Sequence, residues 1–437
     1  MITPIFDFVK QYSESKTARF HMPGHKGVGL LGIEKYDITE ISGADVLYSA
    51  DGIINESENN LSSLYGTAHS FYSTEGSTLA IKAMLALVSE REGDERPLIL
   101  AARNVHTAFI KAAALLDLEV EFIYPERAGH LCRCDVTADD VERSILSASR
   151  KPSAVYLTSP DYLGNMLDIK SIAFVCRENG IPLLVDNAHG AYLKFLPEDQ
   201  HPITLGAAMC ADSAHKTLPV LTGGAYLHIS PDYPEYVEGA RGALSLFAST
   251  SPSYLTLSSL DLCNKYLSED FGDRLSSLCC RISTLKDEIK ALGFSVMDSE
   301  PLKIVIRSGG GLADQLRDRN IEVEYSDGEY TVLMLTVENS DSELEALLDA
   351  LYEIKPQPVN ASDVGVMPHD REMSIRNAVF AKSELVSVEK SAGRISASPT
   401  VSCPPAIPIV VSGERITDGD ILLFKRYGID KVRVVIE

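Results

Sequence analysis

The chain has 437 residues and a formal net charge of −22, with 45% hydrophobic and 23% charged residues. This length predicts two or three domains, and the composition is that of a globular protein. The acidic balance argues against nucleic-acid binding, which needs basic patches, and is compatible with a cationic small molecule. The amino terminus does not resemble a signal peptide, and no uncharged apolar run approaches the ~20 residues of a membrane span. We therefore expect a cytoplasmic protein.

The first half of the chain alternates helices with short apolar strands. Apolar residues at helical spacing predict helices over 77–90, 107–116 and 168–179. Strands are expected over 98–101, 154–157, 183–185 and 225–229. Strands that are apolar throughout and separated by helices are typical of a mainly parallel sheet covered on both faces. Because ligands bind beyond the carboxyl ends of such strands, functional residues are sought there.

The second half changes character. A long helix over 261–292 precedes a small α/β unit, for which we expect a strand over 303–306, a helix over 312–319, two strands across Ser326-Asp327-Gly328 and a helix over 342–352. After the proline-rich residues 356–358 we expect a helix over 374–381 and a short β-rich tail. The predicted domains are residues 1–262, 263–356 and 357–437.

Two motifs that resemble ligand sites are set aside. Cys132 and Cys134 lie near His130, but no second pair completes the four ligands of a zinc site, so we predict thiols in a hairpin and no metal. Residues 27–32 match the dinucleotide-binding glycine pattern, but no apolar strand precedes them.

Lys216 and Asp186 are the first pair of candidate catalytic residues. Lys216 lies between an apolar run and the strand over 225–229, where burial lowers a lysine pKa and favours imine formation. Asp186 ends a buried strand, and a carboxylate there can keep a pyridine nitrogen protonated. Alone, Lys216 also suits an exposed loop and Asp186 a helix cap or turn.

Two further segments stand at strand ends. Residues 73–78 open a helix, where hydroxyls and backbone N–H groups suit a cofactor phosphate, although simple capping by Ser77 or Thr78 is an alternative. His106 follows another strand, where its ring can stack on a cofactor or serve as a structural hydrogen-bonding group. The order and shared placement of these residues indicate a pyridoxal phosphate (PLP) enzyme.

With these segments the chain resembles the Orn/Lys/Arg decarboxylase family of fold-type-I PLP enzymes. The most specific motifs are His-Met-Pro-Gly-His-Lys-Gly at 21–27 and His-Lys-Thr-Leu-Pro at 215–219. The supporting segments are residues 37–40, 73–78, 186–190, 248–254 and 403–408. The resemblance spans nearly the whole chain. It implies an α/β PLP-dependent transferase-like large domain with a mainly parallel sheet, a small α/β domain and a C-terminal α+β segment.

The resemblance also implies roles for individual residues. Lys216 carries the Schiff base, Asp186 pairs with the pyridine nitrogen and His106 stacks on the ring, while His215 joins these three as a catalytic residue. The cofactor-binding residues are Ser77, Thr78, His106, Asp186, His189, Ser213, His215, Lys216, Ser249 and Thr250. Because Ser249 and Thr250 resemble the segment that reaches a neighbouring subunit's cofactor, a homodimer or higher homo-oligomer is expected.

The chain departs from the family pattern at three places. Glu75 stands where a neutral residue is more usual, Gly223 replaces a glutamine, and the N-terminal wing domain of the large decarboxylases is absent from the sequence. The first two departures bear on substrate and efficiency, and the third bears on higher assembly.

The resulting hypothesis is PLP-dependent α-decarboxylation of a basic amino acid, with arginine or lysine favoured over ornithine, in polyamine biosynthesis. Lys216 and His215 are candidates for the proton donor to Cα. Glu75, Asp45, or an acid from the partner or the C-terminal segment would read the cationic side chain. The alternatives are another PLP reaction, such as transamination or elimination, and a non-catalytic PLP-binding regulator.

Overall fold

The computed structural model describes residues 1–89, 95–125, 130–309, 311–359, 368–401 and 405–436. Cys403 and Pro404 of the C-terminal motif lie outside the described residues. The chain divides into two compact units, which are described separately: unit 1 is Met1–Glu90 with Pro182–Arg274, and unit 2 is Arg91–Ile181 with Leu275–Glu437.

Unit 1 contains the strands that precede both Asp186 and Lys216. Its strands are β1 (His69–Ser73), β5 (Leu183–Asp186), β6 (Met209–Asp212) and β7 (Ala225–Ile229). Strand β5 pairs in parallel with β6, and β7 runs antiparallel to both β6 and β1. Every residue of β5, β6 and β7 is buried, which explains why these strands are apolar on both faces.

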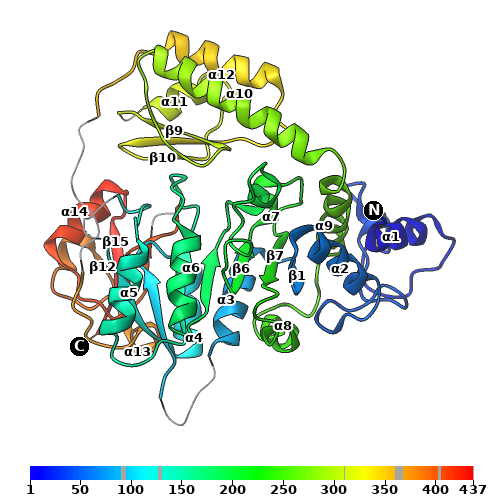
Figure 1. Ribbon diagram of the computed structural model, residues 1–437, viewed down its shortest axis with the longest axis horizontal. Coiled ribbons are helices and arrows are strands. Elements are labelled where there is room, and N and C mark those ends of the chain that lie inside the picture. Colours follow the sequence, from blue (N-terminus) through cyan, green and yellow to red (C-terminus); the bar gives the residue numbers. More distant parts are fainter. Residues whose placement is uncertain (90–94, 126–129, 310, 360–367, 402–404, 437) are drawn as a thin grey trace. The chain divides into compact units, whose positions relative to one another are not determined.

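Most helices of unit 1 pack on these strands or at their ends. They are α1 (Pro4–Glu14), α2 (Ile53–Tyr65), α3 (Gly76–Leu87), α7 (Ala214–Thr217), α8 (Tyr236–Ser245) and α9 (Tyr254–Leu267), with 3₁₀ turns η1 (Glu34–Tyr36), η2 (Leu47–Ser49) and η3 (Ala191–Phe195). The short helix α7 lies at one end of β6 and β7 (Figure 1). It therefore places the Lys216 loop beyond the carboxyl end of β6.

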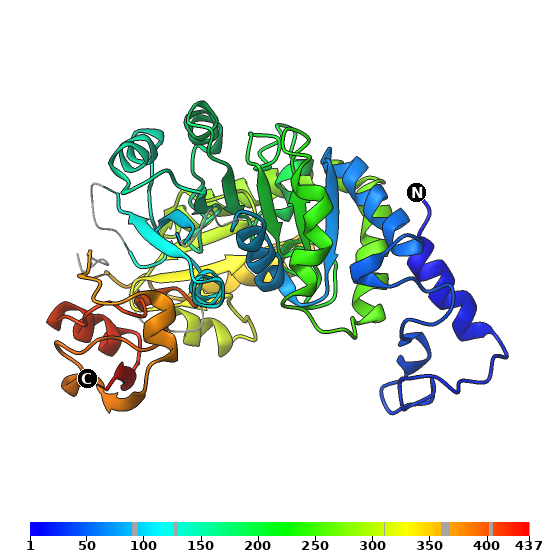
Figure 2. The ribbon, with the colours of Figure 1, turned by 90° about the horizontal axis from the view of Figure 1, so that it is seen from below.

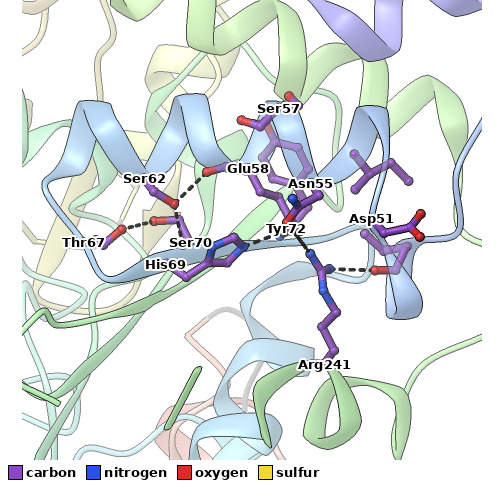
Figure 3. Close-up of polar contacts among 12 residues, drawn as sticks. Asp51, Asn55, Ser57, Glu58, Ser62, Thr67, His69, Ser70, Tyr72 and Arg241 are labelled. Atoms are coloured by element: carbon purple, nitrogen blue, oxygen red, sulfur yellow. Dashed lines mark hydrogen bonds and ion pairs between the residues drawn. The ribbon is translucent and has the colours of Figure 1, made fainter. Parts of the chain in front are cut away.

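A buried polar network fixes α2 against β1 and α8 (Figure 3). The Glu58 carboxylate, fully buried, accepts hydrogen bonds from the Tyr72 backbone N–H at 2.9 Å and from Arg241 at 2.6 Å. His69 Nε2 lies 3.3 Å from the same carboxylate. Since a buried charge is tolerated only when it is paired, these contacts explain why a helix with a buried glutamate is stable here.

Unit 2 contains the remaining strands and helices. Its strands are β2 (Leu98–Ala102), β3 (Glu119–Ile123), β4 (Ala154–Thr158), β8 (Ser295–Met297), β9 (Lys303–Arg307), β10 (Tyr325–Ser326), β11 (Tyr330–Met334), β12 (Ser383–Ser387), β13 (Thr400–Val401), β14 (Pro408–Val410) and β15 (Lys431–Val435). Its helices are α4 (Thr107–Leu116), α5 (Ala138–Ser147), α6 (Ile169–Glu178), α11 (Leu312–Arg317), α12 (Asp341–Glu353), α13 (Ile375–Phe380) and α14 (Asp418–Arg426), with the turn η4 (Val388–Lys390). Helix α10 (Phe271–Ala291) begins in unit 1 and continues in unit 2.

The sheet topology agrees with an α/β fold. Within unit 1 the strands lie in the order β1-β7-β6-β5, and within unit 2 in the order β4-β2-β3, where β2 is parallel to both β3 and β4. The small α/β unit has an antiparallel sheet in the order β10-β11-β9-β8, and the C-terminal segment has two-stranded sheets β12-β15 and β13-β14. No helix of the described residues is both long enough and apolar enough to cross a membrane.

Most predicted elements of the main sheet are confirmed, and two predictions were wrong. The helix expected over 261–292 is two helices, α9 and α10, separated by the polar residues Ser268, Glu269 and Asp270. The tail is not only β-rich, since it contains α14. A capping box between Thr417 and Asp420 begins that helix, which is a signal that the sequence carries.

Candidate active site

Lys216 lies against His189 in unit 1. Its Nζ atom is 2.8 Å from His189 Nε2, and His189 is buried while Lys216 is partly exposed. Two loops bring them together: Lys216 stands on α7 after β6, and His189 stands in the turn after β5. Because β5 and β6 are parallel neighbours, both loops leave the same edge of the sheet. The structure thus joins two residues that the sequence separates by 27 positions.

Asp186 is held at the end of β5 by its own turn. Asp186 is only 2% exposed, and its Oδ1 accepts a hydrogen bond from the Ala188 backbone N–H at 3.2 Å. The turn closes through Gly190, whose N–H donates to the Asn187 carbonyl at 2.8 Å. A Cβ on Gly190 would lie 1.9 Å from Asn187 Oδ1, so a larger residue here would have to displace the Asn187 side chain.

Hydroxyl groups meet at the start of α3. Ser213 Oγ donates to Ser77 Oγ at 2.8 Å, and Ser77 and Thr78 belong to the first turn of that helix. Backbone N–H groups of a first helical turn lack partners within the helix and attract anions. This arrangement suits a phosphate group, and phosphate binding by these residues stays a prediction.

Gly223 supports the same loop. Its carbonyl accepts a hydrogen bond of 2.7 Å from the Gly76 N–H, and its φ of +96° lies in the left-handed region. A Cβ at this position would stand 2.7 Å from the Thr74 carbonyl oxygen. Glycine at position 223 therefore lets the chain approach the segment before α3 closely.

His215 is neutral near physiological pH. Its Nδ1 lies 2.9 Å from the Gly224 carbonyl oxygen, which can only accept, so Nδ1 carries the ring proton. Burial is the main cause that lowers the pKa of His215 below 6.5, and Lys216 adds to the effect while the Gly224 contact opposes it. The remaining nitrogen, Nε2, is left able to accept a proton.

Glu75 connects the Ser249 segment to the start of α3. Its Oε1 accepts a hydrogen bond of 2.7 Å from the Ser249 backbone N–H, and Glu75, Ser249 and Thr250 are all exposed. Burial and the charge of Glu75 both raise the pKa of Tyr48. The Glu75 carboxylate thus lies at the start of α3, beside the Ser249 segment.

His106 belongs to unit 2, so its stacking on a cofactor ring stays a prediction. It caps α4, with Nδ1 accepting a hydrogen bond of 3.1 Å from the Ala108 N–H. This contact leaves the ring proton on Nε2 when the side chain is neutral.

Asp45 has a structural role in the loop before α2. Its carboxylate accepts hydrogen bonds from the backbone N–H groups of Val46, Asp51, Gly52 and Ile54 at 2.8–3.3 Å. A carboxylate used in this way fixes the loop before α2 and is poorly placed to read a substrate.

The cysteines near His130 do not form a metal cluster. Cys132 and Cys134 are buried, and His130 instead contacts Asp327 at 2.8 Å and the Tyr427 hydroxyl at 3.1 Å. In the described part of the chain, one group of side chains is spaced as metal ligands are: His201, Cys210 and Asp212. The sequence prediction did not single out these three residues, whose signal was the alternation of Cys210 and Asp212 on one face of β6.

The residues of unit 1 fit PLP chemically. Lys216 supplies an amine, Asp186 supplies a buried carboxylate, and the Ser77–Ser213 pair supplies hydroxyls at a helix start. Gly76 and Gly223 have no Cβ atoms, so the two backbone segments can approach each other closely at the start of α3. These groups match the aldehyde, pyridine nitrogen and phosphate of the cofactor.

Comparison with known proteins agrees with this fit. The model of the Orn/Lys/Arg decarboxylase major domain matches residues 3–308, and the model of that family's C-terminal domain matches residues 363–426. The chain is 30% identical to the uncharacterized protein YaaO of Bacillus subtilis over 95% of this chain and 92% of that protein. It is 28% identical to an arginine decarboxylase of Bacillus subtilis over 96% of this chain and 92% of that enzyme.

Solved structures share the fold. The lysine decarboxylase LdcF of Francisella novicida superposes with a TM-score of 0.82 at 18% identity, covering 100% of this chain and 81% of that one. The constitutive lysine decarboxylase of Escherichia coli gives a TM-score of 0.80 at 18% identity, covering 100% and 82%. The chain therefore belongs to the Orn/Lys/Arg decarboxylase family of PLP-dependent enzymes.

Proposed function

We propose that the chain removes the α-carboxylate of a basic amino acid as CO2, with arginine or lysine preferred to ornithine. The observation that carries the proposal is the contact between Lys216 and His189 beside the buried Asp186 turn. PLP, when bound, supplies an electron sink for the bond that breaks at Cα. The relatives named as arginine decarboxylases, each matched over more than nine-tenths of its length, support a basic substrate.

Each of the unit 1 residues would have a separate role in the reaction. Lys216 would hold the cofactor, and the Asp186 carboxylate would keep the pyridine nitrogen protonated. Ser77, Thr78 and Ser213 would bind the phosphate through hydroxyls and the start of α3. His215, neutral and with Nε2 unprotonated, would hold or pass a proton beside Lys216.

Glu75 is the better candidate for reading a cationic side chain, because the Asp45 carboxylate is already bonded to four backbone N–H groups. Glu75 is exposed and immediately precedes the phosphate loop glycine. Glu75→Gln is expected to raise KM for arginine about tenfold with a smaller effect on kcat, since a charge-assisted contact to substrate is lost. Glu56→Gln, at another exposed acid of unit 1, is the matched control.

A homodimer with Ser249 and Thr250 near the partner's cofactor would complete the site. Exposed apolar side chains in the segment after α1 support such an interface: Phe20 is 96% exposed, Leu30 is 104% exposed and Leu31 is 80% exposed. This segment extends away from the sheet of unit 1 in both views (Figures 1 and 2). We further propose a cytoplasmic enzyme of polyamine biosynthesis, in line with the amines that such a reaction forms.

The test is CO2 release from arginine, lysine and ornithine by wild type, Lys216→Ala and the control Lys265→Ala. Lys216→Ala should lower activity by at least about 10³-fold, because the residue is expected to bind the cofactor covalently. Lys265→Ala, on the outer face of α9, should behave as wild type. Equal activity of Lys216→Ala and wild type would refute the site. A keto acid product without CO2 would indicate another PLP reaction, and cofactor binding without turnover would indicate a regulator.

A further inference from the structure

Four polar side chains converge on Asp212 beneath the site of unit 1. The carboxylate accepts a hydrogen bond from Asn187 Nδ2 at 2.8 Å, and the Cys210 thiol lies at 3.0 Å. His201 Nε2 lies at 3.0 Å and His228 Nε2 at 3.3 Å. All five residues are 0% exposed.

Asp212 is ionised in this cluster. Burial opposes its charge, but the contacts with His201 and His228 outweigh burial and hold the pKa of Asp212 well below its usual range. Burial lowers the pKa of His228, so that ring is neutral. On its far side, His228 Nδ1 lies 2.8 Å from Ser70 Oγ, which in turn contacts Thr67 (Figure 3). The carboxylate is therefore a buried anion held by the polar side chains around it.

A metal ion does not explain the cluster. The ligand atoms of His201, Cys210 and Asp212 lie within 4.8 Å of one another. However, the Ile203 backbone N–H points at His201 Nδ1 at 3.4 Å, which places the ring proton on Nε2, the atom that faces Asp212. A protonated ring nitrogen cannot bind a metal. The geometry fits hydrogen bonds to a carboxylate instead.

The carboxylate joins the two loops that carry the site. Asn187 directly follows Asp186, and its backbone N–H also donates to the Ala211 carbonyl at 3.0 Å. Asp212 directly precedes Ser213 on the way to Lys216. One contact of 2.8 Å, between Asn187 and Asp212, therefore links the turn of Asp186 and His189 to the loop of Lys216.

We propose that Asp212 is a positioning residue for the cofactor site. By holding Asn187, its carboxylate sets the spacing between the Asp186 turn and the Lys216 loop. The inference rests on the proposed function, since it assumes that PLP binds to these loops. Residues that orient a site from behind commonly change affinity or activity by about 10- to 100-fold when they are replaced.

The test compares Asp212→Asn with Asn187→Ala and their combination. Asp212→Asn keeps the shape but removes the charge, and Asn187→Ala removes the link while Asp212 stays ionised. Four quantities are measured: affinity for PLP after its removal by dialysis, the visible band of the bound cofactor, kcat and KM with arginine, and the melting temperature of the cofactor-free protein. Ser70→Ala is the control, because it deletes a buried hydrogen bond on the far side of His228.

Each single variant should weaken PLP affinity by about tenfold or more and lower kcat with little change in KM. The double variant should be no worse than the more affected single variant, because both act through one contact. Ser70→Ala should lower the melting temperature but leave the cofactor band and affinity as in wild type.

Two results would overturn the proposal: wild-type affinity and band in Asn187→Ala, or effects on affinity that follow melting temperature equally in all variants. If Asp212→Asn does not fold, Asn187→Ala alone decides. A wild-type protein that binds no PLP would instead refute the proposed function and is therefore distinguishable.

Discussion

Two buried aspartates, Asp212 in unit 1 and Asp161 in unit 2, respond to burial in opposite ways. Asp212 lies among side-chain donors that point at its carboxylate, and its pKa is depressed. Asp161 is 2% exposed, and burial raises its pKa to about 6. Burial alone therefore does not set the charge of a carboxylate in this fold.

The difference lies in where the neighbouring donors point. Lys303, fully buried, places its Nζ 2.9 Å from the backbone carbonyl of Asp161 and 3.6 Å from Glu300 Oε1. The Asp161 carboxylate itself accepts from the Asn165 N–H at 3.0 Å. The Lys303 ammonium points at a backbone carbonyl and not at the Asp161 carboxylate. It therefore offsets little of the free-energy cost of burying that carboxylate as an anion, and the pKa of Asp161 stays raised.

The largest effect is expected from Asp212→Leu. Removing the anion leaves the donors of His201 and Asn187 buried without their acceptor, and the free energy of unfolding should fall by about 3–5 kcal/mol. Asp161→Leu is the matched variant and should cost less, because its carboxyl group is more easily neutral. Denaturant unfolding measures both, and a larger loss for Asp161→Leu would contradict the comparison.

The next effect is a dependence of stability on pH at Asp161. Its pKa is about 6 in the folded protein against 3.8 in the unfolded chain, so the folded state binds the extra proton between these values. Stability should therefore fall as pH rises from about 4 to about 6, by about 3 kcal/mol, and this contribution should be constant above that range. Asp161→Asn should remove the fall. An unchanged pH profile in Asp161→Asn would show that other groups cause it.

Asp327, a third buried carboxylate, sharpens the comparison because it lies in unit 2 and has donors like those of Asp212. Burial opposes its charge, but His130 at 2.8 Å and the Tyr325 hydroxyl at 2.6 Å lower the pKa of Asp327 from 3.8 to about 2. Its contribution should be complete above about pH 4 and lost as pH falls towards 2, a change of about 2 kcal/mol. Acid unfolding of Asp327→Asn should lack this loss. If wild type and Asp327→Asn lose the same stability in acid, the pairing is not responsible.

The smallest effect is expected from Cys210→Ala. A thiol is a weak donor, so its removal should cost about 1 kcal/mol while the histidine and asparagine contacts to Asp212 persist. Denaturant unfolding gives this value directly. A loss as large as that of Asp212→Leu would mean that the thiol, and not the imidazoles, stabilises the anion.

The sequence predicted those parts of the fold that depend on local pattern. Helix α4 has the predicted bounds, and the buried strands β2, β4, β5 and β7 were recognised from apolar runs between polar turns. The helix expected over 261–292 was wrong because three polar residues interrupt an otherwise helical pattern. Helix α14 was missed although its capping box is visible in the sequence.

The candidate site was predictable only in part. Lys216, His189 and the Asp186 turn could be expected to meet, because the carboxyl ends of neighbouring parallel strands share one edge. The Asp212 cluster was missed because only the alternation of Cys210 and Asp212 is local. The other contacts to Asp212 come from three separate segments. Asp45 looked like a free acid in the sequence, whereas its φ of +69° and four backbone contacts make it part of a loop.

The most direct test of the account is to reduce the purified protein with borohydride in the presence of PLP and to locate the modified peptide by mass spectrometry. Reduction makes a Schiff base permanent, so the modified lysine identifies itself. The account predicts a pyridoxyl group on Lys216 in wild type and none on that peptide in Lys216→Ala. A modification on another lysine, or none at all, would contradict the assignment of Lys216 and the site built around it.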